Sequence, residues 1–129
     1  MAKSNYLEGK IIDHILRNVA LTSPTTVYVA LSTADPLDTG AGIAEPVALG
    51  YARVAIEFDA ATDGVTQNTN VETFGPASGG TWGTLTHMAI FDAITAGNML
   101  YHGILTASKT VADGDSIEFA AGALSITET

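Results

Sequence analysis

The stretch from Trp82 to Asp92 constrains the fold most, because its second half is apolar at almost every position. A strand places alternate residues on opposite faces. One face would carry Thr84, Thr86, Met88 and Ile90, and the other Leu85, His87, Ala89 and Phe91. Since both faces hold residues that prefer burial, we predict a central strand covered on two sides. The covers would be the rest of its own domain and either the N-terminal helix or another subunit.

Further segments with strand-like alternation surround this central strand. The Ala96-Gly97-Asn98 turn predicts a hairpin that pairs the central strand with residues 99–105. The other predicted strands cover residues 25–33, 51–59, 65–74, 109–111, 116–119 and 123–127, and residues 34–50 form a long loop. With no helix after the first, this pattern predicts a mainly β fold, an antiparallel, jelly-roll-like β-sandwich of about 7–8 strands.

One amphipathic helix is predicted ahead of the strands, over residues 5–19. Asn5 and Glu8 have the spacing of a capping box. Apolar residues recur at helical spacing and form one stripe: Tyr6, Leu7, Ile11, Ile12, Ile15, Leu16 and Val19. We therefore divide the chain into an N-terminal helix or arm, residues 1–20, and a β-sandwich domain, residues 21–129.

Composition limits the partners that the chain can have. Five basic residues stand against fourteen acidic ones, for a net charge of -9, and the basic residues do not cluster. Nucleic-acid binding is not expected, because phosphate contact needs several cations on one face. No membrane partner is expected either, since no apolar run approaches the length of a span. Only 15% of the residues are charged, which is typical of a subunit partly covered by neighbours.

Two histidines provide the strongest hint of chemistry. His87 and His102 lie on the two strands of the predicted hairpin, and Asp92 could join them in a metal or acid–base site. The alternative is a pair of hydrogen-bonded structural histidines, which we favour because no other residues with ligand spacing accompany them. No catalytic, cofactor-binding or metal-binding residue is assigned, and the chain is not expected to be an enzyme.

Two acidic loops have side chains of the kind that bind calcium. They are Asp113-Gly114-Asp115 and the loop with Asp35 and Asp38. Neither has a glutamate at the spacing of a calcium-binding loop, so turn formation by Asp and Gly explains both more simply. Arg53 is expected to pair with a carboxylate on a neighbouring strand.

The blocks TTVYVALSTADP, GYARVAIEF, TWGTLTHMAIFDA, GNMLYHGILTASKTV and GDSIEFAAGALSIT follow the N-terminal helix in that order. This arrangement resembles a family of small tailed-bacteriophage virion proteins, whose members include capsid decoration and tail-fibre-like proteins. The resemblance covers nearly the whole chain. It implies a structural subunit without enzymatic activity, made in the bacterial host cytoplasm and located on the exterior of the virion.

Two structural roles follow from this resemblance. The first is a capsid decoration, or cement, subunit that binds the major capsid protein, copies of itself, or both. The alternative is a tail-fibre or tail-tip adhesin module that binds other tail proteins or host-surface glycan through aromatic residues near Tyr51 and Trp82. The predicted interface residues are Tyr6, Leu7, Ile11, Ile12, Ile15, Leu16, Tyr51 and Trp82.

Overall fold

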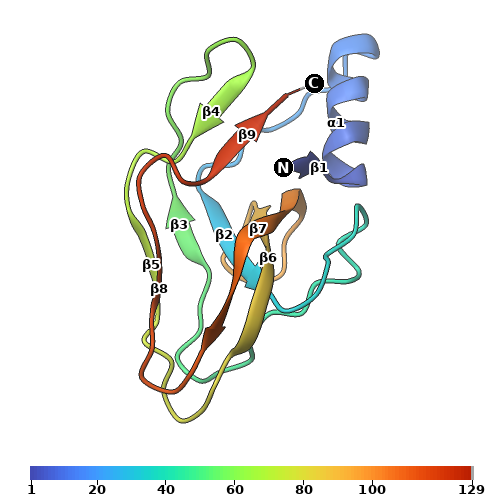
Figure 1. Ribbon diagram of the computed structural model, residues 1–129. Helices are drawn as coiled ribbons and strands as arrows, with labels where there is room; N and C mark the ends of the chain where they lie inside the picture. The colour runs from blue at the N-terminus through green and yellow to red at the C-terminus, as the bar shows by residue number, and fades with distance from the viewer. Residues whose placement is uncertain (129) are drawn as a thin grey trace.

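A computed structural model describes residues 1–128 and shows one principal antiparallel sheet (Figure 1). Its strand order is β1-β7-β6-β2-β3. In chain order the five strands are β1 (Ala2–Lys3), β2 (Val27–Ser32), β3 (Val54–Ile56), β6 (Gly83–Phe91) and β7 (Met99–Val111). The predicted hairpin is confirmed, since β6 pairs antiparallel with β7 along most of its length. β7 is longer than predicted because residues 109–111 continue it.

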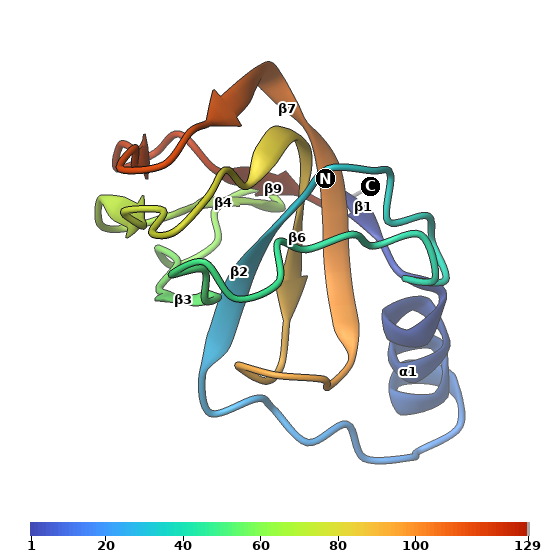
Figure 2. The ribbon, with the colours of Figure 1, turned by 90° about the horizontal axis from the view of Figure 1, so that it is seen from below.

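Two short antiparallel ribbons face this sheet. One ribbon pairs β4 (Val65–Gln67) with β9 (Ser125–Thr127), and the other pairs β5 (Glu72–Phe74) with β8 (Ile117–Phe119). In Figures 1 and 2 the ribbons lie on one side of the sheet, and the helix α1 (Asn5–Leu16) lies beyond the sheet edge formed by β1 and β7. The predicted mainly β fold with one N-terminal helix is confirmed, with two separate ribbons as its second layer.

The main core lies between the sheet and the ribbons. Sheet residues such as Leu31, Leu85 and Ile90 are fully or almost fully buried there. Phe74 of β5 and Ile126 of β9 close the same cluster from the ribbon side. These β-branched, leucine and aromatic residues have the size and the alternation that a two-layer core requires.

The other face of the sheet is covered by the chain's own loop, residues 33–50, which crosses the strands in Figure 2. Ile43 packs there on a small cluster that includes Ala89 and Phe91, and the Ser32 hydroxyl accepts a hydrogen bond from the backbone N–H of Ala44. The chain's own loop therefore takes the place that was predicted for the N-terminal helix. The small alanine side chains of the central strands let the loop approach closely.

Irregular pairing changes the two faces predicted for the central strand. Between the pairs Leu85–Lys109 and His87–Ile104, β6 has one residue and β7 has four, so β7 bulges outward. Leu85 consequently enters the main core together with Met88 and Ile90, although simple alternation placed it on the opposite face. Bulges of this kind leave no clear signal in the apolar pattern.

The predicted strand over residues 65–74 is divided in two by Asn68, which is almost fully buried. Its side-chain amide donates to the carbonyl oxygens of Asn70 and Ala120, and its carbonyl oxygen accepts from the N–H of Leu124. A buried amide with its hydrogen bonds satisfied fixes the crossing between the two ribbons. This polar residue within the predicted strand is thus a structural junction.

Helix α1 begins one residue earlier than the capping box predicted. Ser4 is the N-cap, and its hydroxyl accepts a hydrogen bond from the N–H of Leu7, so the prediction of Asn5 as the cap is wrong. The helix ends at Leu16 rather than at residue 19, followed by Asn18 with a φ of 57°. Asparagine tolerates this left-handed conformation, which stops the helix.

Candidate interaction surface

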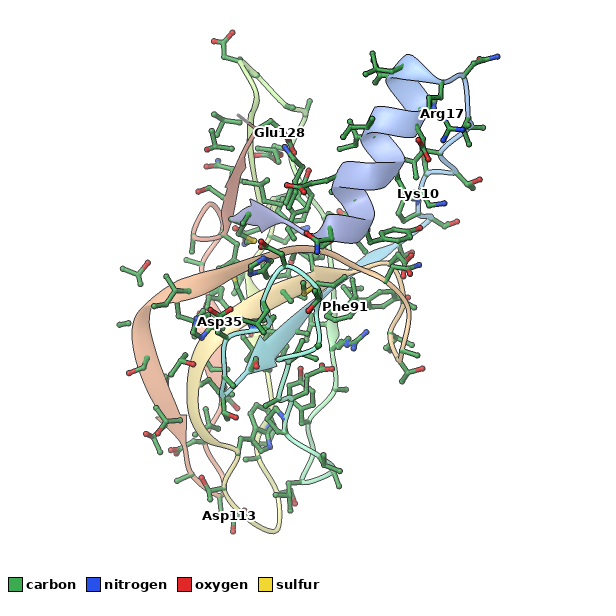
Figure 3. The ribbon with its side chains drawn as sticks, turned by 90° about the vertical axis from the view of Figure 1, so that its right-hand side faces the viewer. Lys10, Arg17, Asp35, Phe91, Asp113 and Glu128 are labelled. Atoms are coloured by element: carbon green, nitrogen blue, oxygen red, sulfur yellow. The ribbon has the colours of Figure 1, made fainter. Side chains whose placement is uncertain are left out.

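Helix α1 has an apolar surface that the rest of the chain does not cover. Ile12, Ile15 and Leu16 are 54%, 70% and 76% exposed, and we call these three residues the α1 face. They are neighbours at helical spacing. A Cβ atom added at Gly9, near the same face, would meet nothing within 4 Å. The helix therefore presents a short apolar stripe to solvent, and Figure 3 shows that α1 lies at the periphery of the molecule.

The opposite side of the helix is fixed to the β-sheet. Leu7 is buried in the main core, and Ile11 packs against that core while remaining partly exposed. Ser4 is also buried, and its backbone N–H and its hydroxyl donate to carbonyl groups of Leu100 and Met99. The α1 face is thus held outward by a rigid attachment.

An ion pair between the two ends of the chain strengthens this attachment. The Lys3 ammonium lies 2.6 Å from one carboxylate oxygen of Glu128, and the other carboxylate oxygen accepts a hydrogen bond from the Tyr101 hydroxyl. The hydrogen bond from Lys3, and then the one from Tyr101, lower the pKa of the Glu128 carboxyl below its usual value. Burial, followed by the hydrogen bond to Glu128, raises the pKa of Tyr101.

The predicted interface residues fall into three groups. Tyr6 and the α1 face are exposed, and the Tyr6 ring also lies 5.7 Å from the Lys10 ammonium. Ile11 and Tyr51 are partly buried against the main core. Leu7 and Trp82 are only 8% and 4% exposed, so their side chains contribute to this chain's own core and not to a free surface.

Tyr51 and Trp82 do come together, but inside the protein. Their ring centroids are 5.4 Å apart with the rings perpendicular, and the Trp82 indole N–H donates to the carbonyl oxygen of Leu49. The Tyr51 hydroxyl donates to Glu45. Burial, then the hydrogen bond to Glu45, strongly raises the pKa of Tyr51. An aromatic pair with this packing is a structural joint and offers no open stacking platform for a sugar ring.

Sequence reasoning missed most of the contacts that Arg53 makes. Its Nε and one terminal nitrogen bind Glu45, with a shortest distance of 2.7 Å, and its other terminal nitrogen donates to the carbonyl oxygens of Ala93 and Ala96. The guanidinium carbon also lies 3.7 Å from the centroid of the Phe91 ring. The predicted carboxylate partner exists, but it belongs to the covering loop and not to a neighbouring strand.

This arginine joins three segments that are distant in the sequence. It fixes the covering loop through Glu45 and the β6–β7 turn through two carbonyl groups, while its own backbone lies beside β3. Its side chain is only 8% exposed. A planar guanidinium can satisfy several acceptors at once, which explains why arginine suits this position. The only sequence signal was a single basic residue in an otherwise alternating strand.

The two histidines of the predicted hairpin have separate partners. His102 Nε2 lies 2.8 Å from a carboxylate oxygen of Asp38, and His87 Nδ1 lies 2.8 Å from the Thr86 hydroxyl. Asp92 instead accepts hydrogen bonds from the backbone and the side chain of Asn98 in the hairpin turn. Within residues 1–128, no three histidine or acidic side chains converge in a way that could hold a metal ion.

The acidic loops use their carboxylates to shape turns. Asp35 accepts from the N–H of Leu37, and Asp115 accepts from the N–H of Ala112. Asp113 accepts from the N–H of Gly79, which connects two loops. These contacts agree with turn formation by Asp and Gly, which was the simpler explanation of the two acidic loops.

No helix in the described residues 1–128 has the length and apolar character needed to cross a membrane.

The comparison with known protein families covers nearly the same span as the resemblance seen in the sequence. A family model described as "Podophage GP4 fiber I protein gp80" matches residues 2–127. A search of curated proteins finds no match. Because the family model spans almost the whole β-fold and helix α1, this chain belongs to the podophage GP4 fiber I protein gp80 family, a family of small tailed-phage virion proteins.

Proposed function

We propose that this protein is a non-enzymatic structural subunit of a podophage fibre, joined to its neighbours through protein–protein contacts at the α1 face. The observation that supports this role is the contrast between the two sides of helix α1. One side is buried against the chain's own core, whereas Ile12, Ile15 and Leu16 remain mostly exposed. The family description, which names a fiber protein, favours a fibre over other positions in the particle.

The second candidate role is a capsid decoration subunit on the exterior of the particle. The compact β-fold favours this role, because residues 1–128, which the structure describes, contain no repeated segment or long helix of the kind that builds a fibre shaft. A decoration subunit would bind the major capsid protein, copies of itself, or both. It would use the same α1 face, since this is the most exposed apolar stripe on a helix or strand of the described residues.

A fibre subunit that binds host glycan through Tyr51 and Trp82 has less support than one that binds other proteins. Trp82 is buried and Tyr51 is partly buried, with its hydroxyl bonded to Glu45, so these rings do not form an open sugar-binding platform. If the fibre contacts host glycans, other residues of this chain or another fibre protein must supply the binding site.

Phage particles that lack this protein distinguish the two roles. For a fibre subunit, we expect particles that contain DNA and keep normal resistance to heat and salt, but adsorb poorly to host cells. For a decoration subunit, adsorption should persist while heat and salt resistance fall. Particles that are normal in both assays would contradict both proposals. Difference imaging of wild-type and deficient particles would then locate the subunit directly.

The absence of catalysis has its own test. His87→Ala and His102→Ala remove the side chains of the only histidines on the central hairpin. We expect phage carrying either substitution to retain adsorption and infectivity, with changes confined to the stability of the isolated protein. Loss of infectivity by a variant that is folded and incorporated at the wild-type level would contradict a purely structural role.

A further inference from the structure

We propose that the bond between Asp63 and Gly64 is a site of covalent self-modification, where the aspartate converts to isoaspartate. The other Asp-Gly pair of the sequence, Asp113-Gly114, is protected from the same reaction by its hydrogen bonds. Glycine has no Cβ atom, so in both pairs its nitrogen can approach the preceding side chain closely. The inference concerns a modification site and goes beyond the proposed structural role.

The reaction needs only the two residues and water. The Gly64 amide nitrogen attacks Cγ of the protonated Asp63 carboxyl group. A bond forms between this nitrogen and Cγ, and the amide proton and the carboxyl hydroxyl leave together as water. One water molecule then opens the resulting succinimide ring. Cleavage between the nitrogen and Cγ restores aspartate, whereas cleavage between the nitrogen and the main-chain carbonyl carbon gives isoaspartate.

Asp63 and Gly64 are the central residues of the tight turn that leads into β4. Around them, the backbone groups of Thr62 and Val65 exchange two hydrogen bonds of 3.0 Å. The φ angles of 52° at Asp63 and 78° at Gly64 are both positive, as in a type I′ turn. Both residues are exposed, and among residues 1–128 the Gly64 N–H has no acceptor and the Asp63 carboxylate has no donor. The attacking nitrogen and its target are therefore both unengaged.

Asp113 and Gly114 are also exposed, but both reacting groups are held by hydrogen bonds. The Gly114 N–H donates to the carbonyl oxygen of Ala77 over 2.8 Å. The Asp113 carboxylate accepts from the N–H of Gly79 over 3.0 Å. Attack would require both contacts to break first. Exposure is thus matched between the two Asp-Gly pairs, and hydrogen bonding distinguishes them.

The position of the Asp63-Gly64 turn favours the change of shape that ring closure requires. The loop ahead of β4 projects from the top of the molecule in Figure 1. Its ribbon is short, because β4 and β9 pair only over Val65–Gln67 and Ser125–Thr127. A short exposed ribbon opens locally at a lower free-energy cost than the strands of the core. The turn can therefore reach the reactive geometry while the principal sheet stays folded.

The product would alter the main chain at a structurally connected point. Isoaspartate routes the main chain through Cβ and Cγ, which adds one atom to the turn. Because a two-residue turn fixes the register of its hairpin, the hydrogen bonds between Thr62 and Val65 would be disturbed. The Gly64 carbonyl also accepts the N–H of Glu128 over 2.7 Å, and Glu128 binds Lys3. The modification would thus loosen the β4–β9 ribbon next to the segment that precedes α1.

Ageing of the full chain at neutral pH tests the proposal. Folded protein and protein unfolded in urea are incubated in parallel. Protein L-isoaspartyl methyltransferase detects isoaspartate, and peptide mapping assigns it to residue 63 or residue 113. In the folded protein we expect about tenfold more isoaspartate at residue 63, because two hydrogen bonds must break before residue 113 can react. In urea we expect similar amounts at both residues.

Two matched variants separate the sites. Asp63→Glu and Asp113→Glu keep the charge but lengthen the side chain, which greatly slows ring closure. We expect Asp63→Glu to remove most of the isoaspartate formed by the folded protein, and Asp113→Glu to leave that amount unchanged. Far-UV circular dichroism checks that both variants are folded, and Asp63→Ser replaces Asp63→Glu if glutamate disturbs the turn.

Two results would overturn the proposal. Equal amounts of isoaspartate at residues 63 and 113 of the folded protein would show that the hydrogen bonds of Asp113-Gly114 give no protection. Isoaspartate at residue 63 in urea but not in the folded protein would show that the turn itself prevents the reaction. Neither result decides the role in the particle, which the adsorption and heat-resistance assays test separately.

Discussion

The β-domain and helix α1 differ in the groups that they bury and expose: the β-domain buries polar groups, whereas α1 exposes apolar ones. In the β-domain, the charged Arg53 and the amide of Asn68 are both buried, and each has several hydrogen-bond partners inside the chain. On α1, by contrast, the apolar side chains of Ile12, Ile15 and Leu16 are mostly exposed to water. The buried polar groups of the β-domain are satisfied within the chain, whereas one side of the helix presents apolar surface that the chain does not cover.

This difference shows where an assembly contact can be recognised. A low content of charged residues suggested that much of the surface would be covered by neighbours, but the covering loop and the two ribbons already bury most of the apolar residues. The remaining apolar surface is more local than the composition indicated. It is concentrated on α1 and includes single exposed residues such as Val47 and Ile104.

The largest expected effect comes from removing the arginine that joins the loop to the sheet. Arg53→Ala leaves Glu45 without its ionic partner and two carbonyl groups without a donor. Breaking a buried ion pair by removing one partner is strongly destabilising, so we expect a loss of about 3 kcal/mol in the free energy of unfolding. Urea unfolding at pH 7 measures it. A loss below about 1 kcal/mol would show that the loop is held in place without Arg53.

The second prediction compares two apolar residues of the same helix. Leu7→Ala should lower the free energy of unfolding by about 2 kcal/mol, because Leu7 is 8% exposed and its removal leaves a cavity. Ile15→Ala should change it by less than about 0.5 kcal/mol, because Ile15 is 70% exposed. Both variants are measured in dilute protein, because dilution disfavours self-association. Equal effects would remove the distinction between the buried and exposed sides of α1.

A smaller effect is expected at Glu72, a buried carboxyl in β5. Burial, and then the charge of Glu57, raises the pKa of Glu72 in the folded protein. A raised pKa in the folded state favours folding below the pKa of the unfolded state, and this contribution is lost as pH rises through the folded pKa. Glu72→Gln should therefore raise the melting temperature at pH 7 and have little effect at pH 4 or below. A lower melting temperature at pH 7 would indicate that the carboxylate has a favourable partner.

The smallest expected effect has the opposite pH dependence and concerns the ion pair beside α1. The pKa of Glu128 is lowered in the folded protein by Lys3 and Tyr101. Its stabilising contribution is therefore present above the pKa of the unfolded carboxyl and is lost as pH falls through the folded pKa. Glu128→Gln should lower the melting temperature slightly at pH 7, and the difference from the wild type should disappear in acid. A difference that persists in acid would assign the effect to packing.

The sequence predicted the parts of the fold that depend on local patterns. The alternation in residues 99–105 and the Ala-Gly-Asn turn were sufficient to predict the β6–β7 hairpin, and helical spacing was sufficient to predict α1. Long-range features were not predictable in the same way. The bulge opposite Thr86, the junction at Asn68 and the partners of Arg53 depend on segments that are far apart in the sequence.

The interface prediction was also limited because local patterns do not show long-range contacts. An apolar stripe on a helix indicates that one side is buried, but does not indicate which residues the chain itself covers. Leu7 and Ile15 belong to one stripe in the sequence, yet the structure buries the first and exposes the second. Trp82 was predicted at an interface as one of the aromatic residues near a glycan contact, and here it fills the core.

Cysteine labelling in intact particles tests the central claim most directly, since the natural chain contains no cysteine. Leu16→Cys places a single thiol on the α1 face, and Ile94→Cys places a control thiol in the exposed β6–β7 turn. Each variant is treated with a maleimide as dilute free protein and as part of the assembled particle. We predict that both thiols react in the free protein, and that Leu16→Cys becomes protected in the particle while Ile94→Cys stays reactive. Equal reactivity of the two thiols in the particle would show that the α1 face is not the assembly contact.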